Sequence, residues 1–381
     1  MRKIVVACDS FKGSLSSREA NRAVAEGIKD APGDCETICV EVADGGEGTA
    51  EVLTMSLGGG QVKASVHDPL MRPVVAGYGI AGDTAIMEMA AASGLGLLSK
   101  NERNPLITTT FGTGEMILDA LGKGCRRFIL GIGGSATNDG GTGMLSALGY
   151  RFLDACGDVL PCTGGSLHLI RSIDCSGANP SLSGCSFKVA CDVRAPFCGP
   201  DGATYVFGPQ KGASNEDIEV LENGMVNLSE IIERQTGIDI SRMPGAGAAG
   251  GLGGALYAFL GAELVPGADL VLDTLGFRET ISGADLVITG EGCLDSQTVM
   301  GKVPAGVLRR CVEKGIPCIA VGGRLKTRET LLASGFASCH SITPDWMDDI
   351  AAMRPDTALS NLRRTVRKII SENCSITHQT V

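Results

Sequence analysis

Residues 128–143 read FILGIGGSATNDGGTG, a short apolar run followed by a long glycine-rich loop. A helical pattern starts near residue 141 and continues to residue 148. A short, continuous apolar run bounded by turn residues is typical of a strand covered on both faces. The order of strand, glycine-rich loop and helix predicts an α/β layered fold.

The same order recurs outward from this stretch in both directions. Strands are predicted at residues 3–8, 37–42, 74–80, 85–89, 128–132, 187–191, 285–289 and 318–321, and helices at residues 17–30, 112–121, 141–148, 217–234, 248–260, 303–313 and 359–371. Ser16 or Ser17 is the expected N-cap of the first helix, with Glu19 near its positive end. The alternation is regular at both ends of the chain and mixed in the middle. We therefore predict a discontinuous α/β domain of residues 1–60 and 285–381, with a mixed α/β domain of residues 61–284 inserted into it.

Composition excludes several classes of partner. The chain of 381 residues has a net charge of −10 and no dense cluster of lysine and arginine, so nucleic acid is not an expected partner. Residues 243–262 are uncharged over a length that could span a bilayer, but seven of them are glycine, and we expect no membrane span. The 15 cysteines form no C-x-x-C motif, and no signal peptide opens the chain, so we expect reduced thiols and a cytoplasmic location.

Two loops near the N-terminus combine glycine with acids, hydroxyls or lysine. The first is DSFKGS (residues 9–14), directly after the opening strand, and the second is ADGGEGT (residues 43–49). Ligands of open α/β sheets bind beyond the carboxyl ends of the strands, which gives the first loop a functional interpretation. A helix N-cap with a solvated lysine is the structural alternative. The second loop is either a turn or a Mg²⁺ site, because Mg²⁺ takes a few carboxylates together with water and phosphate oxygens.

The loop at residues 131–143 has the sharpest signal. Backbone N–H groups exposed by glycines before a helix form an anion site, which favours a phosphate cradle. Gly131, Gly133 and Ala136 also match the dinucleotide pattern G-x-G-x-x-A, with Asp154 at the distance of a ribose contact. The glycines continue for another seven residues, whereas a dinucleotide fingerprint runs straight into its helix. A purely structural loop is the third interpretation.

Acids and cations also follow two later strands. Asp192 and Arg194 end one strand, where they form either a structural ion pair or a base with an anion clamp. The segment FGPQKG (residues 207–212) follows them, and GEGCLDSQT (residues 290–298) precedes Lys302. The motifs of P-loop NTPases, protein kinases, serine hydrolases and zincins are absent. Acids, glycine-rich N–H groups and lysines without a histidine or cysteine centre favour phosphoryl transfer, which needs positioning and charge neutralisation.

Taken together, these motifs resemble the type-1 glycerate kinase family. The residues that carry the resemblance lie in the family's order at 9–15, 43–49, 109–115, 131–139, 207–213 and 288–292. The resemblance implies phosphorylation of D-glycerate by ATP, at the 2-hydroxyl to give 2-phosphoglycerate and ADP, in the catabolism of glyoxylate, glucarate or related acids. It also implies that the discontinuous domain is flavodoxin-like and that the active site lies in the cleft between the domains. ATP and Mg²⁺ are the expected cofactors.

Residue chemistry at the matching positions gives expected roles. Asp192 is the expected general base on the substrate hydroxyl, with Asp295 as its rival. The other expected contacts are Lys12 and Lys211 for phosphoryl or carboxylate charge; Ser10, Arg194 and Lys302 for the substrate; Gly133, Gly134, Ser135, Thr137 and Asn138 for the nucleotide phosphates; and Asp44, Glu47 and Glu291 for Mg²⁺.

Three departures from the family pattern concern substrate preference more than reaction class. Cys8 replaces a proline, Ala195-Pro196-Phe197 replaces Asn-Pro-Leu, and Cys293 replaces an arginine, a cation that Arg194 is expected to supply. The alternative functions are an NAD-dependent oxidoreductase of a small hydroxy acid and a non-catalytic protein that binds organic acids. The oligomeric state is left open.

Overall fold

The structure, a computed structural model, describes residues 2–376, and the chain divides into two compact units. Unit 1 comprises Met1–Asp44 and Ala268–Val381, and unit 2 comprises Gly45–Gly267. The boundaries predicted from the sequence, after residues 60 and 284, lie closer to the C-terminus than these observed boundaries after Asp44 and Gly267. The backbone N–H of Ala50 donates to Glu88 Oε1 at 3.0 Å, which holds the segment after Gly45 in unit 2. At the other boundary, Arg310 binds Asp269 and Asp273 at 2.8 and 2.6 Å, which holds the segment after Gly267 in unit 1.

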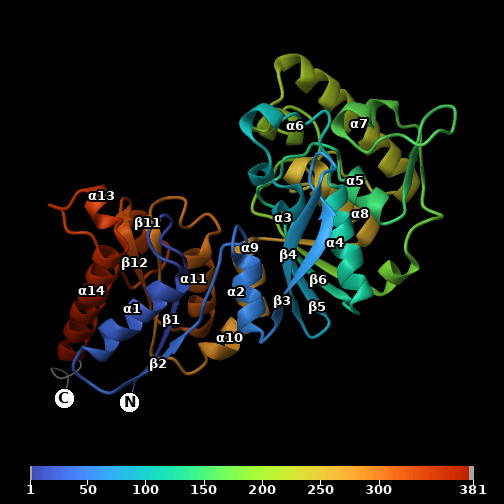
Figure 1. Ribbon diagram of the computed structural model, residues 1–381. Helices are drawn as coiled ribbons and strands as arrows, with labels where there is room; N and C mark the ends of the chain where they lie inside the picture. Colours follow the sequence, from blue (N-terminus) through green and yellow to red (C-terminus); the bar gives the residue numbers. More distant parts are fainter. Residues whose placement is uncertain (1, 377–381) are drawn as a thin grey trace. The chain divides into compact units, whose positions relative to one another are not determined.

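Unit 1 is built on a five-stranded parallel sheet (Figure 1). In spatial order its strands are β13 (Ser338–Ser341), β12 (Cys318–Leu325), β11 (Leu286–Leu294), β1 (Arg2–Cys8) and β2 (Cys35–Cys39). Numbered within the unit, this order is 2-1-3-4-5, which is the flavodoxin-like order. The predicted fold class is therefore confirmed.

Helices cover both faces of the unit 1 sheet. The helices of unit 1 are α1 (Ser17–Lys29), α9 (Gly267–Thr274), α10 (Phe277–Thr280), α11 (Val303–Lys314), α12 (Arg328–Ala333), α13 (Asp349–Ala352) and α14 (Pro355–Ile376). Ile4 and Val6 of β1 pack with α1 and α14, whereas Val5 and Ala7 pack with α10 and α11. Because both sets of alternate residues are buried, β1 reads as a continuous apolar run.

Local sequence explains how α1 begins and how it packs. Ser16 caps the helix: its side chain accepts from the N–H of Glu19, and its own N–H donates to the Glu19 carboxylate at 2.9 Å. This reciprocal pair confirms the predicted cap. At Gly27, a β-carbon would lie 2.6 Å from the carbonyl oxygen of Arg363, so glycine permits the close approach of α14.

Unit 2 is built on a six-stranded mixed sheet. In spatial order its strands are β10 (Glu263–Val265), β9 (Ser186–Ala190), β6 (Arg127–Gly131), β5 (Thr84–Glu88), β4 (Pro73–Ala81) and β3 (Gly60–His67). The four strands from β10 to β5 are parallel, and β4 and β3 extend the sheet as antiparallel strands. A small two-stranded sheet, β7 (Arg151–Leu153) and β8 (Ser172–Asp174), lies apart from it.

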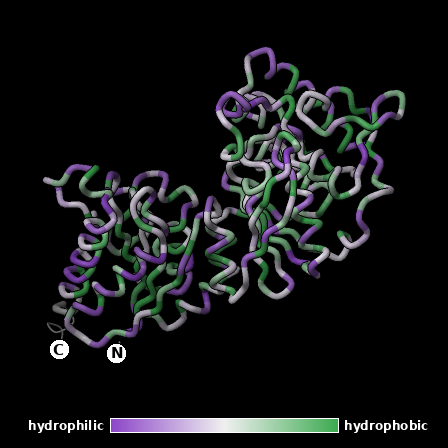
Figure 2. The backbone as a smooth tube through the Cα atoms, viewed as in Figure 1, coloured by the Kyte–Doolittle hydropathy of each residue, from purple (hydrophilic) through white to green (hydrophobic). Residues whose placement is uncertain are grey.

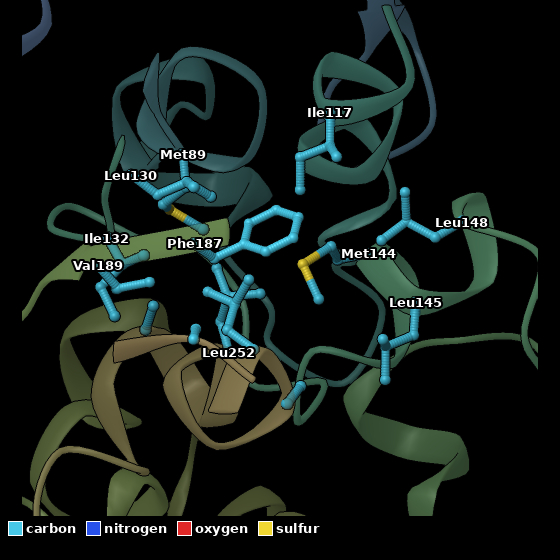
Figure 3. Close-up of a cluster of buried hydrophobic side chains, with 14 of the residues drawn as sticks. Met89, Ile117, Leu130, Ile132, Met144, Leu145, Leu148, Phe187, Val189 and Leu252 are labelled. Carbon is cyan, nitrogen blue, oxygen red and sulfur yellow. The ribbon is translucent and has the colours of Figure 1, made fainter. Parts of the chain in front are cut away.

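One large apolar core stabilises unit 2. The helices that accompany its sheet are α2 (Thr49–Ser56), α3 (Ala90–Ser93), α4 (Phe111–Gly122), α5 (Thr142–Ala147), α6 (Ala203–Phe207), α7 (Asn215–Thr236) and α8 (Leu252–Leu260). Figure 3 shows side chains from β6, β9, α4, α5 and α8 meeting around Phe187. The rings of Phe128 and Phe187, which are register partners, stack with centroids 4.7 Å apart. In Figure 2 the hydrophobic segments gather in the interior of each unit, as this packing requires.

Candidate active site

Unit 1 contains a cavity of about 400 Å³ at the carboxyl ends of β1, β11 and β12. Strand order reverses between β1 and β11, and ligands of open α/β sheets bind at such a switch point. The cavity is lined by Asp9, Ser10, Phe11, Lys12, Ser14, Asp44, Glu291, Gly292, Cys293, Lys302, Gly323, Arg324, Lys326, Ile342, Thr343, Asp349, Ala352, Met353 and Ala358.

Most carboxylates of the unit 1 cavity face a cation. Lys12 Nζ lies 3.2 Å from Asp44 Oδ2, and Lys302 Nζ lies 3.1 Å from Glu291 Oε2. Glu291 is 6% exposed and also accepts a hydrogen bond from the Thr298 hydroxyl at 2.7 Å. These pairs bring four expected site residues into the lining of one cavity.

Asp9, the first residue of the loop at residues 9–14, also lines this cavity, although the sequence analysis assigned it no role of its own. It is 6% exposed and accepts from the Ser10 N–H at 2.7 Å. Burial raises the pKa of Asp9 to about 7, and the charges of Asp44 and Glu291 act in the same direction. Asp9 is therefore partly protonated at neutral pH.

An Asp9→Asn variant is expected to become relatively more stable as pH rises. Wild-type Asp9 ionises near pH 4 when unfolded but near pH 7 when folded, so wild-type stability falls between these values as pH increases. Asparagine lacks this loss, so the stability advantage of the variant should grow by about 2–3 kcal/mol from pH 5 to pH 8. Calorimetric Tm values at both pH values measure it. The exposed Asp345→Asn variant is the control, and an equal difference at both pH values would refute the buried-acid interpretation.

Unit 2 contains a second cavity, of about 330 Å³. It is lined by Gly45, Gly46, Leu95, Ile132, Gly133, Gly134, Ser135, Ala190, Cys191, Asp192, Val193, Phe207, Gln210, Lys211, Ala248 and Ala249. Within residues 2–376, the N–H groups of Gly133, Gly134 and Ser135 donate no hydrogen bond. Gly134 has φ +74°, which turns the loop at the cavity wall. Backbone N–H groups without a partner in a cavity lining are an anion-binding arrangement.

A buried lysine and an aspartate complete this cavity. Lys211 is 1% exposed, and its Nζ donates to the Thr137 carbonyl oxygen at 2.7 Å. Burial lowers the pKa of Lys211 to about 7, against the opposing charge of Asp139. Asp192 Oδ1 accepts from the N–H of Gly267 at 2.8 Å, which fixes one oxygen of the carboxylate. The cavity therefore combines free amides, an amine and a carboxylate.

The buried side chain of Asp139 links the end of the glycine-rich loop to the start of α4. Its fully buried carboxylate accepts from the N–H and hydroxyl of Thr110, both at 2.7 Å, and from the N–H groups of Gly141 and Gly143. Burial raises the pKa of Asp139, and these donors oppose that effect. The adjacent side chains of Thr137 and Asn138 are also fully buried, and Thr137 Oγ1 and Asn138 Oδ1 have no hydrogen-bond partner among the described residues.

The expected site residues fall into two sets and a remainder. Unit 1 brings together Ser10, Lys12, Asp44, Glu291 and Lys302, and unit 2 brings together Gly133, Gly134, Ser135, Asp192 and Lys211. Thr137 and Asn138 support the unit 2 loop without lining its cavity. Glu47, Arg194 and Asp295 line neither cavity. Asp295 Oδ1 instead accepts from the N–H of Gln297 at 2.9 Å in a local turn.

Arg324 and Lys326 are cavity residues that the sequence analysis missed. They follow Gly322 and Gly323 at the end of β12, so the same glycine-rich strand end that marked the other loops could have found them. Arg324 is the register partner of Cys293, where an arginine was expected. Arg324 of β12 therefore lies beside Cys293, the position where the family pattern has an arginine. Arg194, the cation expected to replace that arginine, is exposed and belongs to unit 2.

Two observations bear on cofactors. Among residues 2–376, no three or more His, Cys, Asp and Glu side chains are grouped closely enough to hold a metal by themselves. The helix after the glycine-rich loop starts at Thr142, well past Ala136, and Asp154 Oδ1 accepts from the N–H groups of Cys156 and Asp158 at 2.8 and 2.9 Å. Both features disfavour the dinucleotide interpretation. A dinucleotide fingerprint runs straight into its helix, and the carboxylate that would bind the ribose is here hydrogen-bonded within its own turn.

Comparison with known proteins decides the family. The model of the glycerate kinase family matches residues 4–373. The chain belongs to the glycerate kinase family. A glycerate kinase from Halalkalibacterium halodurans is 43% identical over 98% of this chain and 100% of its own length. A glycerate 2-kinase from Escherichia coli K12 is 48% identical over 85% of each chain.

A solved structure supports the same assignment. The crystal structure of a Salmonella typhimurium LT2 protein assigned as glycerate kinase 2 has 42% sequence identity, a TM-score of 0.89 and 99% coverage of both chains. As a member of the glycerate kinase family, the chain is an enzyme, a phosphotransferase with an alcohol group as acceptor. Within the described residues, no helix has the length and apolar character of a membrane span.

Proposed function

We propose that this enzyme transfers the γ-phosphoryl group of ATP to the 2-hydroxyl of D-glycerate, giving 2-phosphoglycerate and ADP. The glycerate 2-kinase among its relatives supports this choice of hydroxyl. The observation that carries the proposal is the unit 2 cavity, where Asp192 and Lys211 share a wall with the free amides of Gly133, Gly134 and Ser135. Phosphoryl transfer to an alcohol needs a carboxylate that accepts the hydroxyl proton and, beside it, groups that bind the phosphate oxygens.

Asp192 is the proposed general base. Its carboxylate takes the proton of the 2-hydroxyl, the hydroxyl oxygen bonds to the γ-phosphorus, and the bond from phosphorus to the bridging oxygen breaks to release ADP. The N–H of Gly267 donates to Oδ1 of this carboxylate at 2.8 Å, which orients the side chain. Asp295 is the weaker candidate, because its carboxylate accepts a turn N–H and lines neither cavity.

Backbone N–H groups and lysine side chains are the proposed binding partners of the phosphate and carboxylate groups of the reactants. The free N–H groups of the glycine-rich loop would hold phosphate oxygens, with Thr137 and Asn138 supporting the loop from behind. Lys211 and Lys12 would neutralise phosphoryl or carboxylate charge. Ser10, Lys302 and Arg194 remain the proposed contacts of the acid substrate, and Arg194 is the least supported because it lines neither cavity.

Mg²⁺ is part of the proposal. The carboxylates of Asp44 and Glu291 line one cavity and offer the hard oxygen ligands that Mg²⁺ prefers. Mg²⁺ needs only one or two carboxylates when phosphate oxygens and water complete its shell, so two acids suffice, with exposed Glu47 as a third candidate. When bound with ATP, the ion would offset charge on the phosphate oxygens.

The proposal also covers the cellular compartment of the enzyme, its metabolic role and the position of its active site. The cysteines whose side chains the structure describes are free thiols, which fits a reducing, cytoplasmic compartment. A role in catabolism of glyoxylate, glucarate or related acids, and an active site in an interdomain cleft, stay predictions.

A coupled ADP-release assay over a panel of small hydroxy acids tests the reaction. We expect ADP formation with D-glycerate that requires Mg²⁺, and a rise in Tm with ATP–Mg²⁺ but not with NADH. Oxidation or reduction of a nicotinamide by a hydroxy acid would favour the oxidoreductase. Binding of D-glycerate with no ADP release would favour the binding protein.

A further inference from the structure

An acid is buried on α7, a helix whose other buried residues are mostly apolar. Glu222 is 9% exposed, and Leu221, Met225 and Leu228 of the same helix are buried as well. Burying a carboxyl in such surroundings costs free energy unless hydrogen bonds compensate for the lost water. α7 packs against α6, and the chain leads from α6 directly to Lys211 of the unit 2 cavity (Figure 1).

The carboxyl of Glu222 engages the segment that leads into α6 at two points. Its Oε1 accepts from the N–H of Gly199 at 2.5 Å. Burial raises the pKa of Glu222, and the Gly199 N–H and the Thr204 hydroxyl oppose this effect. Oε2 has no partner within hydrogen-bond distance among the described residues, so the Thr204 hydroxyl acts on the carboxyl from slightly further away.

Thr204 extends this connection to the glycine-rich loop. Its hydroxyl accepts from Asn138 Nδ2 at 3.2 Å, and both side chains are fully buried. A second link joins the same two segments, because Lys211 Nζ donates to the Thr137 carbonyl oxygen at 2.7 Å. The loop that presents the free amides and the segment that carries Lys211 are therefore tied together at two adjacent residues.

We propose that Glu222 is a positioning residue of the unit 2 cavity. Its carboxyl fixes Gly199 and Thr204, and through Thr204 and Asn138 it holds Lys211 in place beside the glycine-rich loop. Glu222 is not among the residues that line the cavity, so it acts on a ligand only through these groups. The kinetic part of this proposal rests on the proposed function, whereas the placement of Lys211 is a property of the fold.

Acetylation of the native full-length enzyme by an acyl ester, followed by peptide mass spectrometry, measures how firmly Lys211 is held. Lys211 is 1% exposed and should react slowly, and exposed Lys188 gives the reactivity of an open amine. Glu222→Met removes the carboxyl at similar side-chain length, and we expect the ratio of the Lys211 rate to the Lys188 rate to rise about fivefold, because the segment opens more often. Glu222→Gln keeps an acceptor for the Gly199 N–H and should leave the ratio unchanged. An unchanged ratio in Glu222→Met would overturn the proposal.

A second variant keeps the test decisive if Glu222→Met does not fold. Thr204→Val replaces the hydroxyl by a methyl group, which breaks the same connection, and should also raise the ratio about fivefold. Glu230 is an exposed acid on the same helix, so Glu230→Met is the matched control and should leave the ratio unchanged. Equal increases in Glu230→Met and Glu222→Met would contradict a specific role of the buried acid.

ADP-release kinetics provide the functional test. In Glu222→Met, kcat/KM for ATP should fall about tenfold, because Lys211 and the free amides are no longer held in one arrangement. Glu222→Gln should stay within about twofold of wild type. A role in stability alone would lower Tm and leave kcat/KM of the folded variant unchanged, which would refute the positioning role. Absence of ADP release from wild-type enzyme with D-glycerate would instead refute the proposed function, and the acetylation ratios would still decide the role of Glu222.

Discussion

Replacing Asp192 by asparagine is expected to lower kcat by about 10²–10⁴-fold, the usual effect of losing a general base. Asparagine keeps an oxygen that can accept from the Gly267 N–H, so the local structure should persist while the proton acceptor is lost. Steady-state ADP release at saturating ATP and D-glycerate measures kcat. An unchanged Tm and a KM for ATP within about twofold of wild type would show that the fold and nucleotide binding are intact.

Asp295→Asn is the matched control for this prediction, because Asp295 is the rival base on another strand end. Its carboxylate accepts the Gln297 N–H in a turn, so we expect kcat within about threefold of wild type. If Asp295→Asn abolished turnover and Asp192→Asn retained it, the base would be Asp295 and the assignment here would be wrong.

Replacing Asp139 by alanine should destabilise unit 2 by about 3–5 kcal/mol. The change leaves the N–H and hydroxyl of Thr110 and the N–H groups of Gly141 and Gly143 without their acceptor in a fully buried place. Each unsatisfied buried donor costs about 1–3 kcal/mol, partly offset by removing a buried carboxyl. Urea unfolding followed by circular dichroism measures the loss, and the glycine-rich loop should lose its geometry and ligand affinity with it.

Asp154→Ala serves as the matched control for Asp139. Its carboxylate also accepts two backbone N–H groups, but in an exposed turn where water can replace it. We expect a loss of at most about 1 kcal/mol. Equal losses for the two variants would contradict the claim that burial of the Asp139 network stabilises the loop.

Much of the local structure could be predicted from sequence because its signals are local. The apolar run at residues 3–8 became β1, the Ser16–Glu19 pair became a capping box, and the run at residues 318–321 became the start of β12. The flavodoxin-like strand order could not come from periodicity, since pairing between β1 and β11 joins residues far apart in the chain. The family resemblance supplied it.

Domain boundaries depended on contacts that no local pattern reveals. Arg310 is almost fully buried and binds Asp269 and Asp273, which pulls α9 into unit 1. In the sequence these arginine and aspartate residues are about 40 positions apart, and no local pattern links them. The ion pairs are seen only in the folded structure, where α9 packs beside α11.

The candidate site was predictable where glycines mark a strand end. Gly133, Gly134 and Ser135 line a cavity as expected, and so do Asp44 and Glu291. Asp9 received no individual role although its loop was singled out, and Arg324 and Lys326 were not singled out at all. Single charged residues after a strand are common, and a role for them became evident only from the shared cavity lining. Arg194 shows the converse, since proximity in sequence to Asp192 did not place it in the cavity lining.

Phosphorus and proton NMR of the product formed from D-glycerate and ATP–Mg²⁺ tests the central claim most directly. The account predicts one phosphorylated acid, 2-phosphoglycerate, in equal amount to the ADP released. A product phosphorylated at the 3-hydroxyl, or no phosphorylated acid at all, would contradict it.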